Sequence, residues 1–120
     1  MERTGMKVYG IPNCDTVARA RKYLNGRGVT YQFCDLRGEP GIDAETIARA
    51  YQVLGAATFN TRSPSWRSLD SAQQTALKEG RDFSAAVATP TVLKRPLVFA
   101  DDQILNGFNA KVWDPLFTAH

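Results

Sequence analysis

The sequence predicts an α/β domain in which helices cover a small mixed sheet. Three observations predict this class: a strand–helix–strand pattern at the start, a long helical pattern in the middle, and a β-hairpin near the end. The chain has 120 residues, a usual length for one domain, and neither a repeat nor a linker-like stretch divides it. We therefore expect a single domain over residues 1–120, with a helical insertion at about residues 43–88.

The first elements form the strand–helix–strand pattern. Residues 6–11 are apolar and rich in β-formers, which is typical of a short buried strand. In residues 14–25 the apolar side chains recur at spacings of three and four, which predicts an amphipathic helix with Asn13 as its N-cap. Residues 29–34 alternate as a second strand. A unit of this length predicts a parallel strand pair with a right-handed crossover.

The middle of the chain is predicted to be helical. Asp43 precedes apolar residues at positions i, i+3, i+4 and i+7, so we expect it to cap a helix. Residues 55–64 are predicted as a loop. From residue 66 to about residue 88 the pattern indicates a helix in two pieces, with a break near Gly80. Aromatic side chains at helical spacing in this region are expected to form core rather than a partner surface.

A hairpin and a last helix complete the prediction. Residues 96–100 and 103–105 are β-rich and flank the polar pair Asp101–Asp102, which is typical of a hairpin turn. Residues 109–117 are amphipathic enough for a helix, although Pro115 opposes one. Trp113 is expected to pack this helix onto the sheet.

Composition narrows the functional classes. Hydrophobic residues make up 43% of the chain and charged residues 22%, which is ordinary for a globular protein and unlike a fibrous or disordered one. No apolar stretch approaches the roughly 18–20 residues that span a bilayer, and the start lacks a signal-like pattern, so we expect a cytoplasmic protein. The net charge of +3 is dispersed. Neither direct nucleic-acid binding nor membrane binding is therefore expected.

The chain has two cysteines and one histidine, His120. Two cysteines are too few for a disulfide scaffold. A single histidine opposes histidine-based catalysis and a multi-histidine metal site. We expect neither a metal nor a nucleotide as cofactor.

Cys14 is the candidate nucleophile because of its position at the predicted strand-to-helix turn. Free N–H groups of a first helical turn favour a thiolate and also bind oxyanions. The carboxylate of Asp15 opposes ionisation of the neighbouring sulfur. The alternative interpretation is a small buried hydrophobic residue, a common role for a lone cysteine.

Cys34 has two interpretations, a resolving thiol and an inert strand cysteine. Val17 stands where a Cys-x-x-Cys pair would place its second thiol, so the partner of Cys14 must come from elsewhere. Cys34 would need a Cα within about 7 Å of that of Cys14. An external thiol such as glutathione is the favoured interpretation.

Three motifs carry a family resemblance. The run Tyr9–Thr16, the triplet Asn60-Thr61-Arg62 and the triplet Lys94-Arg95-Pro96 together resemble the arsenate-reductase-like (ArsC/Spx) family, over about residues 6–118. The resemblance is greatest to its monothiol YffB-like branch of glutathione-dependent thiol reductases. It implies a thioredoxin-like fold with a helical insertion.

The resemblance also implies a site. Cys14 would be the nucleophile, Arg62 and Arg95 would line its oxyanion pocket, and Pro96 would be a cis-proline. Guanidinium groups beside a thiolate favour its charge and bind oxyanions or carboxylates bidentately. The remaining members of the implied substrate- and anion-binding set, beside Pro96, are Asn13, Asp15 and Thr16.

One departure from the family bears on the substrate. Arsenate reductases carry a third arginine after the hairpin, and the matching stretch Ile104–Phe108 has none, which disfavours arsenate. The predicted function is therefore a monomeric, glutathione-dependent thiol reductase acting on a thiol or disulfide substrate. The alternative is an Spx-like, non-catalytic regulator that binds RNA polymerase through the helical insertion, although Val17 removes the Cys-x-x-Cys switch usual in such regulators.

Overall fold

The computed structural model describes residues 6–39, 41–100 and 103–117. The chain divides into two compact units, each described here by itself. The sheet unit comprises Met1–Asp35 and Arg95–His120, and the helical unit comprises Leu36–Lys94. The helical unit contains the range expected for the insertion and extends beyond it at both ends.

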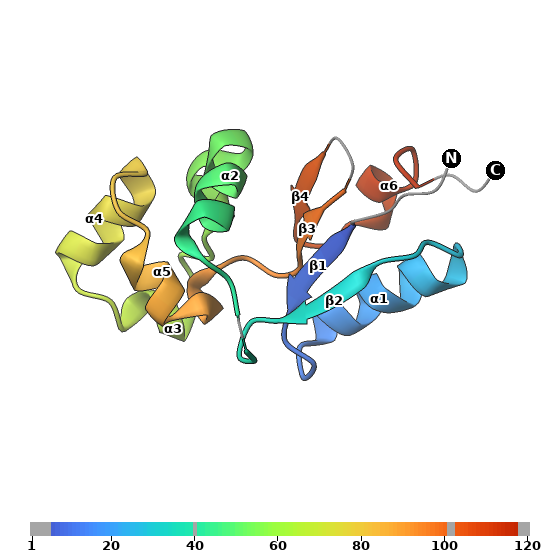
Figure 1. Ribbon diagram of the computed structural model, residues 1–120, viewed down its shortest axis with the longest axis horizontal. Coiled ribbons are helices and arrows are strands. Elements are labelled where there is room, and N and C mark those ends of the chain that lie inside the picture. The colour runs from blue at the N-terminus through green and yellow to red at the C-terminus, as the bar shows by residue number, and fades with distance from the viewer. Residues whose placement is uncertain (1–5, 40, 101–102, 118–120) are drawn as a thin grey trace. The chain divides into compact units, whose positions relative to one another are not determined.

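The described strands of the sheet unit are β1 (Lys7–Gly10), β2 (Gln32–Asp35), β3 (Leu97–Phe99) and β4 (Ile104–Asn106). They form one sheet in the order β2-β1-β3-β4 (Figure 1). β1 runs parallel to β2 and antiparallel to β3, which pairs in turn with antiparallel β4. The predicted parallel pair and the predicted hairpin are both confirmed, while the Asp101–Asp102 turn and His120 lie outside the described residues. The described helices of this unit are α1 Asp15–Gly26 and α6 Ala110–Trp113.

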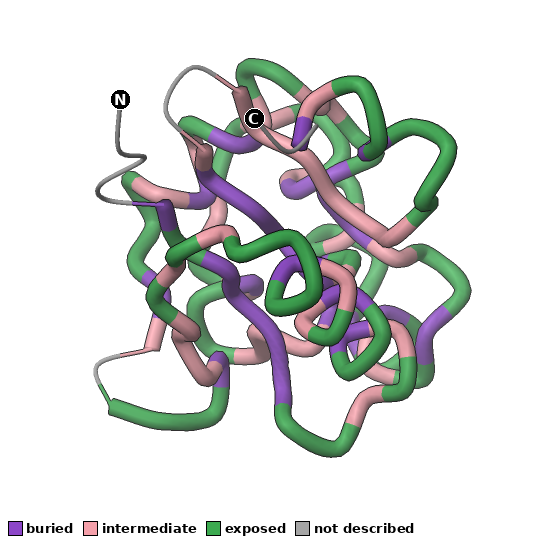
Figure 2. The backbone as a smooth tube through the Cα atoms, turned by 90° about the vertical axis from the view of Figure 1, so that its right-hand side faces the viewer, coloured by how far each residue is buried: buried purple, intermediate pink, exposed green. Residues whose placement is uncertain are grey.

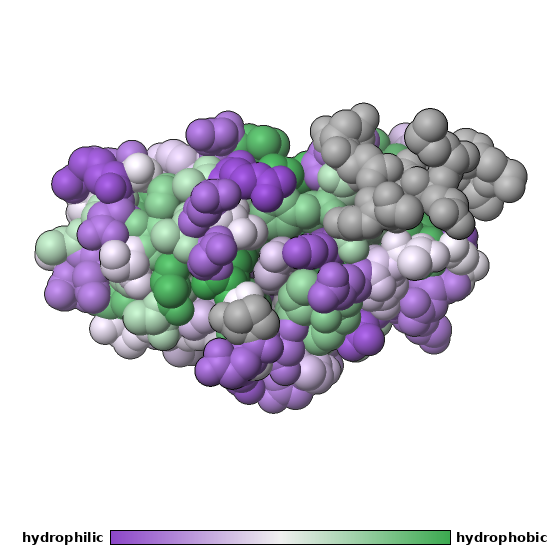
Figure 3. All heavy atoms as spheres, in the orientation of Figure 1, coloured by the Kyte–Doolittle hydropathy of each residue, from purple (hydrophilic) through white to green (hydrophobic). Residues whose placement is uncertain are grey.

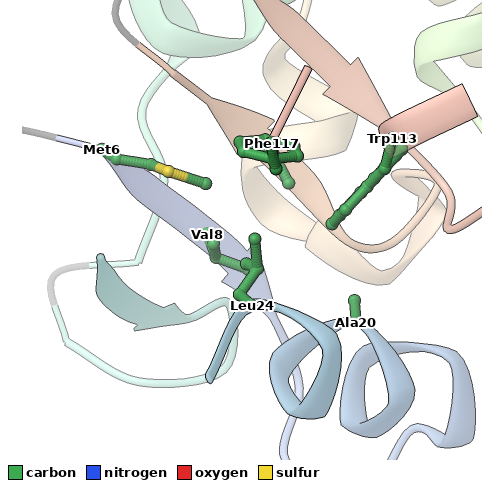
Figure 4. Packing of buried hydrophobic residues seen from close by; sticks show 7 residues of the cluster. Met6, Val8, Ala20, Leu24, Trp113 and Phe117 are labelled. Carbon is green, nitrogen blue, oxygen red and sulfur yellow. The ribbon is translucent and has the colours of Figure 1, made fainter. Parts of the chain in front are cut away.

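One face of this sheet is covered by α1 and by the segment around α6. Val8 is paired with Val98 in neighbouring strands, so both side chains lie on the same face. Trp113 is 2% exposed and packs into the cluster that contains both valines, which confirms the packing predicted for it. Figure 4 shows side chains from β1, α1 and the C-terminal segment turned toward one another. The buried members are Met6, Val8, Ala20, Leu24, Val98, Trp113 and Phe117.

The helical unit consists of helices of at most eleven residues, as far as the structure describes it (Figure 1). In chain order they are α2 Ala44–Leu54, η1 Gly55–Thr58, α3 Pro64–Arg67, α4 Ser71–Glu79, α5 Ser84–Ala88 and η2 Pro90–Val92. Within this unit, α2, α3 and α4 each begin with a side-chain cap. The predicted cap of its first helix is confirmed, because the Asp43 carboxylate accepts a hydrogen bond of 2.8 Å from the Thr46 amide. The predicted loop from residue 55 instead begins with one turn of 3₁₀-helix.

The two-piece helix predicted for residues 66–88 is wrong, because this stretch contains three helices. The predicted break at Gly80 is confirmed. The additional break arises at Asp70. Its carboxylate accepts a hydrogen bond from the backbone N–H of Gln73, and the side-chain oxygen of Gln73 accepts one from the backbone N–H of Asp70. This capping box begins a new helix and separates α4 from α3. The local signal was therefore present in the sequence, but the continuous apolar pattern obscured it.

Aromatic side chains form the interior of the helical unit. Trp66 is 4% exposed, and its ring centroid lies 5.9 Å from that of Phe59. Tyr51 packs against both Phe59 and Phe83, and its hydroxyl donates a 2.6 Å hydrogen bond to the carbonyl of Lys78. Trp66 and Phe59 are buried, which confirms the predicted core there, while Tyr51 and Phe83 are half-buried and pack against it.

The distribution of buried and exposed residues agrees with the cores described above. Buried stretches of the backbone, purple in Figure 2, lie inside, and most turns, in green, lie outside. On the face shown in Figure 3, hydrophobic residues gather over the helical unit between polar ones. Val53 in α2 and Val87 in α5 are large hydrophobic residues of this unit that remain exposed. Within the described ranges, no helix has both the length and the apolarity needed to cross a membrane.

Candidate functional site

Cys14 is the N-cap of α1, the longest helix of the chain's described part. Its backbone is extended (φ −109°, ψ 123°), and its carbonyl accepts a 2.9 Å hydrogen bond from the Ala18 amide. The prediction of Asn13 as N-cap is therefore wrong by one residue, because helical geometry begins only at Asp15. The side chain of Cys14 makes no capping hydrogen bond, and the leading N–H groups of α1 lie beside this half-buried thiol.

The position of α1 depends on a close approach to β1. A Cβ on Gly10 would lie only 2.8 Å from Cγ2 of Val17, a residue buried on the inner face of α1. The glycine lets the first turns of the helix pack directly against the end of the strand. The chain then passes through buried Ile11 and an exposed Pro12–Asn13 turn before it reaches Cys14.

Arg95 and Pro96 lie at the end of the sheet from which the Cys14 loop emerges. Tyr9 is paired with Leu97, so continuing the antiparallel register places Pro96 and Arg95 beside the residues that follow Tyr9. The Arg95–Pro96 peptide bond is cis, as the resemblance implied. Arg95 is half-buried with its Nε atom inside the protein, and the Pro96 carbonyl accepts a 3.0 Å hydrogen bond from the amide of Gly107.

Cys34 lies at the same end of the sheet but on the other face. It is paired with Tyr9, one position along from the Val8–Phe33 pair that packs toward α1. Since side chains alternate along a strand, Cys34 points away from the face that α1 covers. Burial raises the pKa of the Cys34 thiol, and the positive charge of Lys7 offsets part of this rise. This environment suits a protonated strand cysteine better than an attacking thiolate.

Arg62 belongs to the helical unit, where it occupies a tight turn before α3. The Asn60 side chain accepts a 3.2 Å hydrogen bond from the Arg62 amide, and the Asn60 carbonyl accepts one from the Ser63 hydroxyl. Ser63 in turn caps α3 through the Trp66 amide. The turn holds the backbone of Arg62 and leaves its side chain exposed.

The raised pKa of the Cys34 thiol predicts the pH range in which that thiol is alkylated. In the Cys14→Ser variant, the rate at which iodoacetamide alkylates Cys34 should rise at a higher pH in the folded protein than in the urea-unfolded chain. The unfolded thiol ionises first, so above about pH 8.5 this group should also lower the stability of the fold as pH rises. Rate profiles of the two states that coincide would contradict the effect of burial.

Comparisons with known proteins show the family to which this chain belongs. The family model described as "ArsC family" matches residues 9–116, which is most of the chain. The chain belongs to the ArsC family. It is 35% identical, over 92% of its own length and 96% of the other, to an uncharacterized protein of Haemophilus influenzae.

Solved structures of ArsC-family relatives support the fold. A structure of a YffB protein is 31% identical to this chain, covers 94% of it and 99% of its own length, and has a TM-score of 0.85. An arsenate reductase (ArsC) related protein from Brucella melitensis is 29% identical, over 98% and 96% of the two chains, with a TM-score of 0.68. The mixed sheet and its helices are the thioredoxin-like fold that the resemblance implied, and that prediction is confirmed.

The residues predicted for the ArsC-type site divide between the two units. The sheet unit brings the Asn13–Thr16 turn, Arg95 and Pro96 to one end of the sheet, with Cys34 on the opposite face. Arg62 is contributed by the other unit. Gly10, which sets the position of α1, was missed; a glycine inside an apolar strand was the available signal. In the described residues, no three histidine, cysteine, aspartate or glutamate side chains come together as a metal-binding group.

Proposed function

We propose that this ArsC-family chain is a glutathione-dependent thiol reductase with Cys14 as its nucleophile. Membership of the ArsC family supports a thiol reductase of the arsenate-reductase-like kind. The observation that carries the proposal is the position of Cys14 at the start of α1, where its own side chain makes no capping hydrogen bond to the leading N–H groups. A thiolate or a bound anion at this point gains from the helix dipole and from those donors.

The proposed reaction is two successive thiol–disulfide exchanges. The Cys14 thiolate attacks the glutathionyl sulfur of a mixed disulfide, so that a Cys14–glutathione bond forms and the substrate leaves as a thiolate that takes a proton from water. A second glutathione thiolate then attacks the glutathionyl sulfur on Cys14. Glutathione disulfide leaves, and Cys14 is regenerated as a thiolate. In the net reaction the substrate sulfur is reduced from the disulfide to the thiol level, and the sulfur of the second glutathione is oxidised from the thiol to the disulfide level; the first glutathionyl sulfur stays at the disulfide level throughout.

The arginines are proposed to bind the carboxylates of glutathione. Arg95 is favoured for this role because it lies at the same end of the sheet as the Cys14 loop. Arg62 is proposed as a second donor because the ArsC/Spx resemblance implies it. Both side chains offer the paired N–H groups that carboxylates accept. Backbone N–H groups of Thr16 and Val17 would support an anion beside the sulfur.

A substrate other than arsenate is proposed because of the strand after the hairpin turn. β4 ends at Asn106 beside Leu97, close in the register to Pro96, and carries no arginine. A multiply charged oxyanion would therefore have one cation fewer than in the arsenate reductases, at a loss of about 1.5–3 kcal/mol for a charged hydrogen bond. A disulfide has no such requirement.

The test replaces each cysteine in turn. Cys14→Ser should lower reduction of a glutathionylated peptide by about 10³-fold or more, because the nucleophile itself is lost, whereas Cys34→Ser should remain within about twofold of the unaltered protein. Intact-mass measurement after incubation with glutathione disulfide should show one glutathionyl group, located on Cys14. A Cys14→Ser protein that retains full activity would overturn the proposal.

The alternative, a regulator that binds RNA polymerase, has one observation in its favour. Val53 and Val87 expose hydrophobic surface on the helical unit, which an interface could bury. A pull-down of purified RNA polymerase with the unaltered chain and with a Val53→Ser/Val87→Ser variant tests it. Stable binding that the double variant loses would favour the regulator, and no binding would leave the reductase as the function.

A further inference from the structure

A groove of about 330 Å³ opens between the outer flank of α1 and the strand segment leading into β2. It lies wholly within the sheet unit. Arg21 in α1 is seven residues, or two helical turns, after Cys14, a separation of about 10 Å along the helix axis. The lining residues are Arg21, Asn25, Val29, Thr30, Tyr31 and Phe33.

Arg21 is held in this groove by two aromatic neighbours. Its guanidinium carbon lies 4.0 Å from the centroid of the Phe33 ring, and its Nε atom donates a 3.3 Å hydrogen bond to the hydroxyl of Tyr31. These contacts fix the plane of the guanidinium group but use only one of its N–H groups. Within the described residues, its terminal nitrogens donate to no acceptor, and none of the lining residues is acidic.

The remaining lining groups complete a mixed polar and apolar surface. Asn25, Thr30 and the Tyr31 hydroxyl offer hydrogen-bonding groups, while Val29 and the Phe33 ring offer apolar contact. Ligand sites have volumes of about 300–1,000 Å³, and this groove is at the lower end of that range. Its accessible lining is more polar than apolar, which suits a charged ligand. The size suits a short peptide rather than a large cofactor.

We propose that this groove binds the carboxylate of a small peptide-like anion, with the terminal nitrogens of Arg21 as the principal donors. A guanidinium group oriented by neighbours that do not neutralise it is prepared for a bidentate contact with a carboxylate. The apolar part of the ligand lies against Val29. The site does not depend on the chemistry of Cys14.

The experiment uses two matched probes and the Cys14→Ser protein, in which the proposed thiol exchange is absent. N-acetyl-leucylglycine carries one carboxylate, and N-acetyl-leucylglycinamide is the same molecule with a neutral amide. In an NMR titration, the acid should shift the amide signals of Arg21, Tyr31 and Phe33 with a Kd of about 1 mM. The neutral amide should bind about tenfold more weakly, because the charge-assisted contact is lost.

Variants then locate the carboxylate contact. Arg21→Gln should weaken binding of the acid about tenfold, to the level of the neutral probe. Arg19→Gln is the matched control, because Arg19 is exposed on the same helix and outside the groove, and it should leave the affinity unchanged. Equal binding of the two probes, shifts that fall away from α1 and β2, or no saturation by about 10 mM would each overturn the proposal. The two probes test it on an unaltered groove even where Arg21→Gln disturbs the fold.

Discussion

Replacing Trp113 by alanine is expected to lower the free energy of unfolding by about 3–5 kcal/mol, the cost of removing a large buried aromatic side chain. The Trp113 ring lies 5.0 Å from the Phe108 ring, 5.5 Å from Phe117 and 5.8 Å from Tyr23, measured between centroids. Its side chain joins the C-terminal segment to β1 and α1 in the cluster of Figure 4. The variant would leave a cavity that its neighbours fill only in part.

Because α6 is short, the Trp113→Ala variant should lose more stability than the buried area of the side chain alone implies. α6 has four residues, too few to be stable as a helix without tertiary contacts. Besides the packing of Trp113, α6 is joined to α1 through Asp114, the residue that follows α6. The Asp114 carboxylate accepts hydrogen bonds from the Tyr23 hydroxyl and the Arg27 guanidinium group. Both contacts are exposed and therefore contribute little.

Urea unfolding followed by far-UV circular dichroism measures the effect. The control is Val112→Ala in the same helix, where the side chain is 56% exposed and the change should stay within about 0.5 kcal/mol. Similar losses in the two variants would contradict the role of Trp113 as the attachment of α6.

Replacing Gly80 by alanine is expected to cost about 2–5 kcal/mol, the sum of a left-handed backbone and an overpacked contact. Gly80 ends α4 with a φ of +69°, where a side chain is strained. A Cβ there would also lie 2.5 Å from Cε1 of Tyr51. The Tyr51 ring is held by Phe83 and by the hydrogen bond to Lys78, so it is not free to move aside.

Variants at two other glycines distinguish the strain of a left-handed backbone from the overpacked contact with Tyr51. Gly28 also has a φ of +69°, but a Cβ there meets nothing within 4 Å, so Gly28→Ala should cost only about 1–2 kcal/mol. Gly26 lies in α1, has no positive φ and has open space around its Cα, so Gly26→Ala should stabilise by about 0.5–1 kcal/mol. Urea unfolding of the three variants measures all of these changes. Equal losses at Gly80 and Gly28 would show that the contact with Tyr51 contributes nothing.

Most elements of this chain were predictable from local signals, although the local capping box at Asp70 was missed. The strand–helix–strand start, the Asp43 cap, the break at Gly80 and the hairpin all follow from side-chain periodicity and from residues with strong turn or cap preferences. The same signals placed Cys14 at the start of a helix, which is the basis of the candidate site. The choice of cap between Asn13 and Cys14 was wrong by one residue, because capping preference favours asparagine while the backbone becomes helical only after Cys14.

Contacts between distant residues decided the rest, and no local pattern specifies them. Strand register placed Arg95 and Pro96 at the end of the sheet from which the Cys14 loop emerges, and strand alternation turned Cys34 away from α1. The close approach of Gly10 to Val17 and the groove around Arg21 likewise depend on how α1 packs on the sheet. The sequence by itself determined which residue types stand at strand ends and helix starts. Only tertiary packing decided which of them share a face, because register and helix docking depend on side chains far apart in the chain.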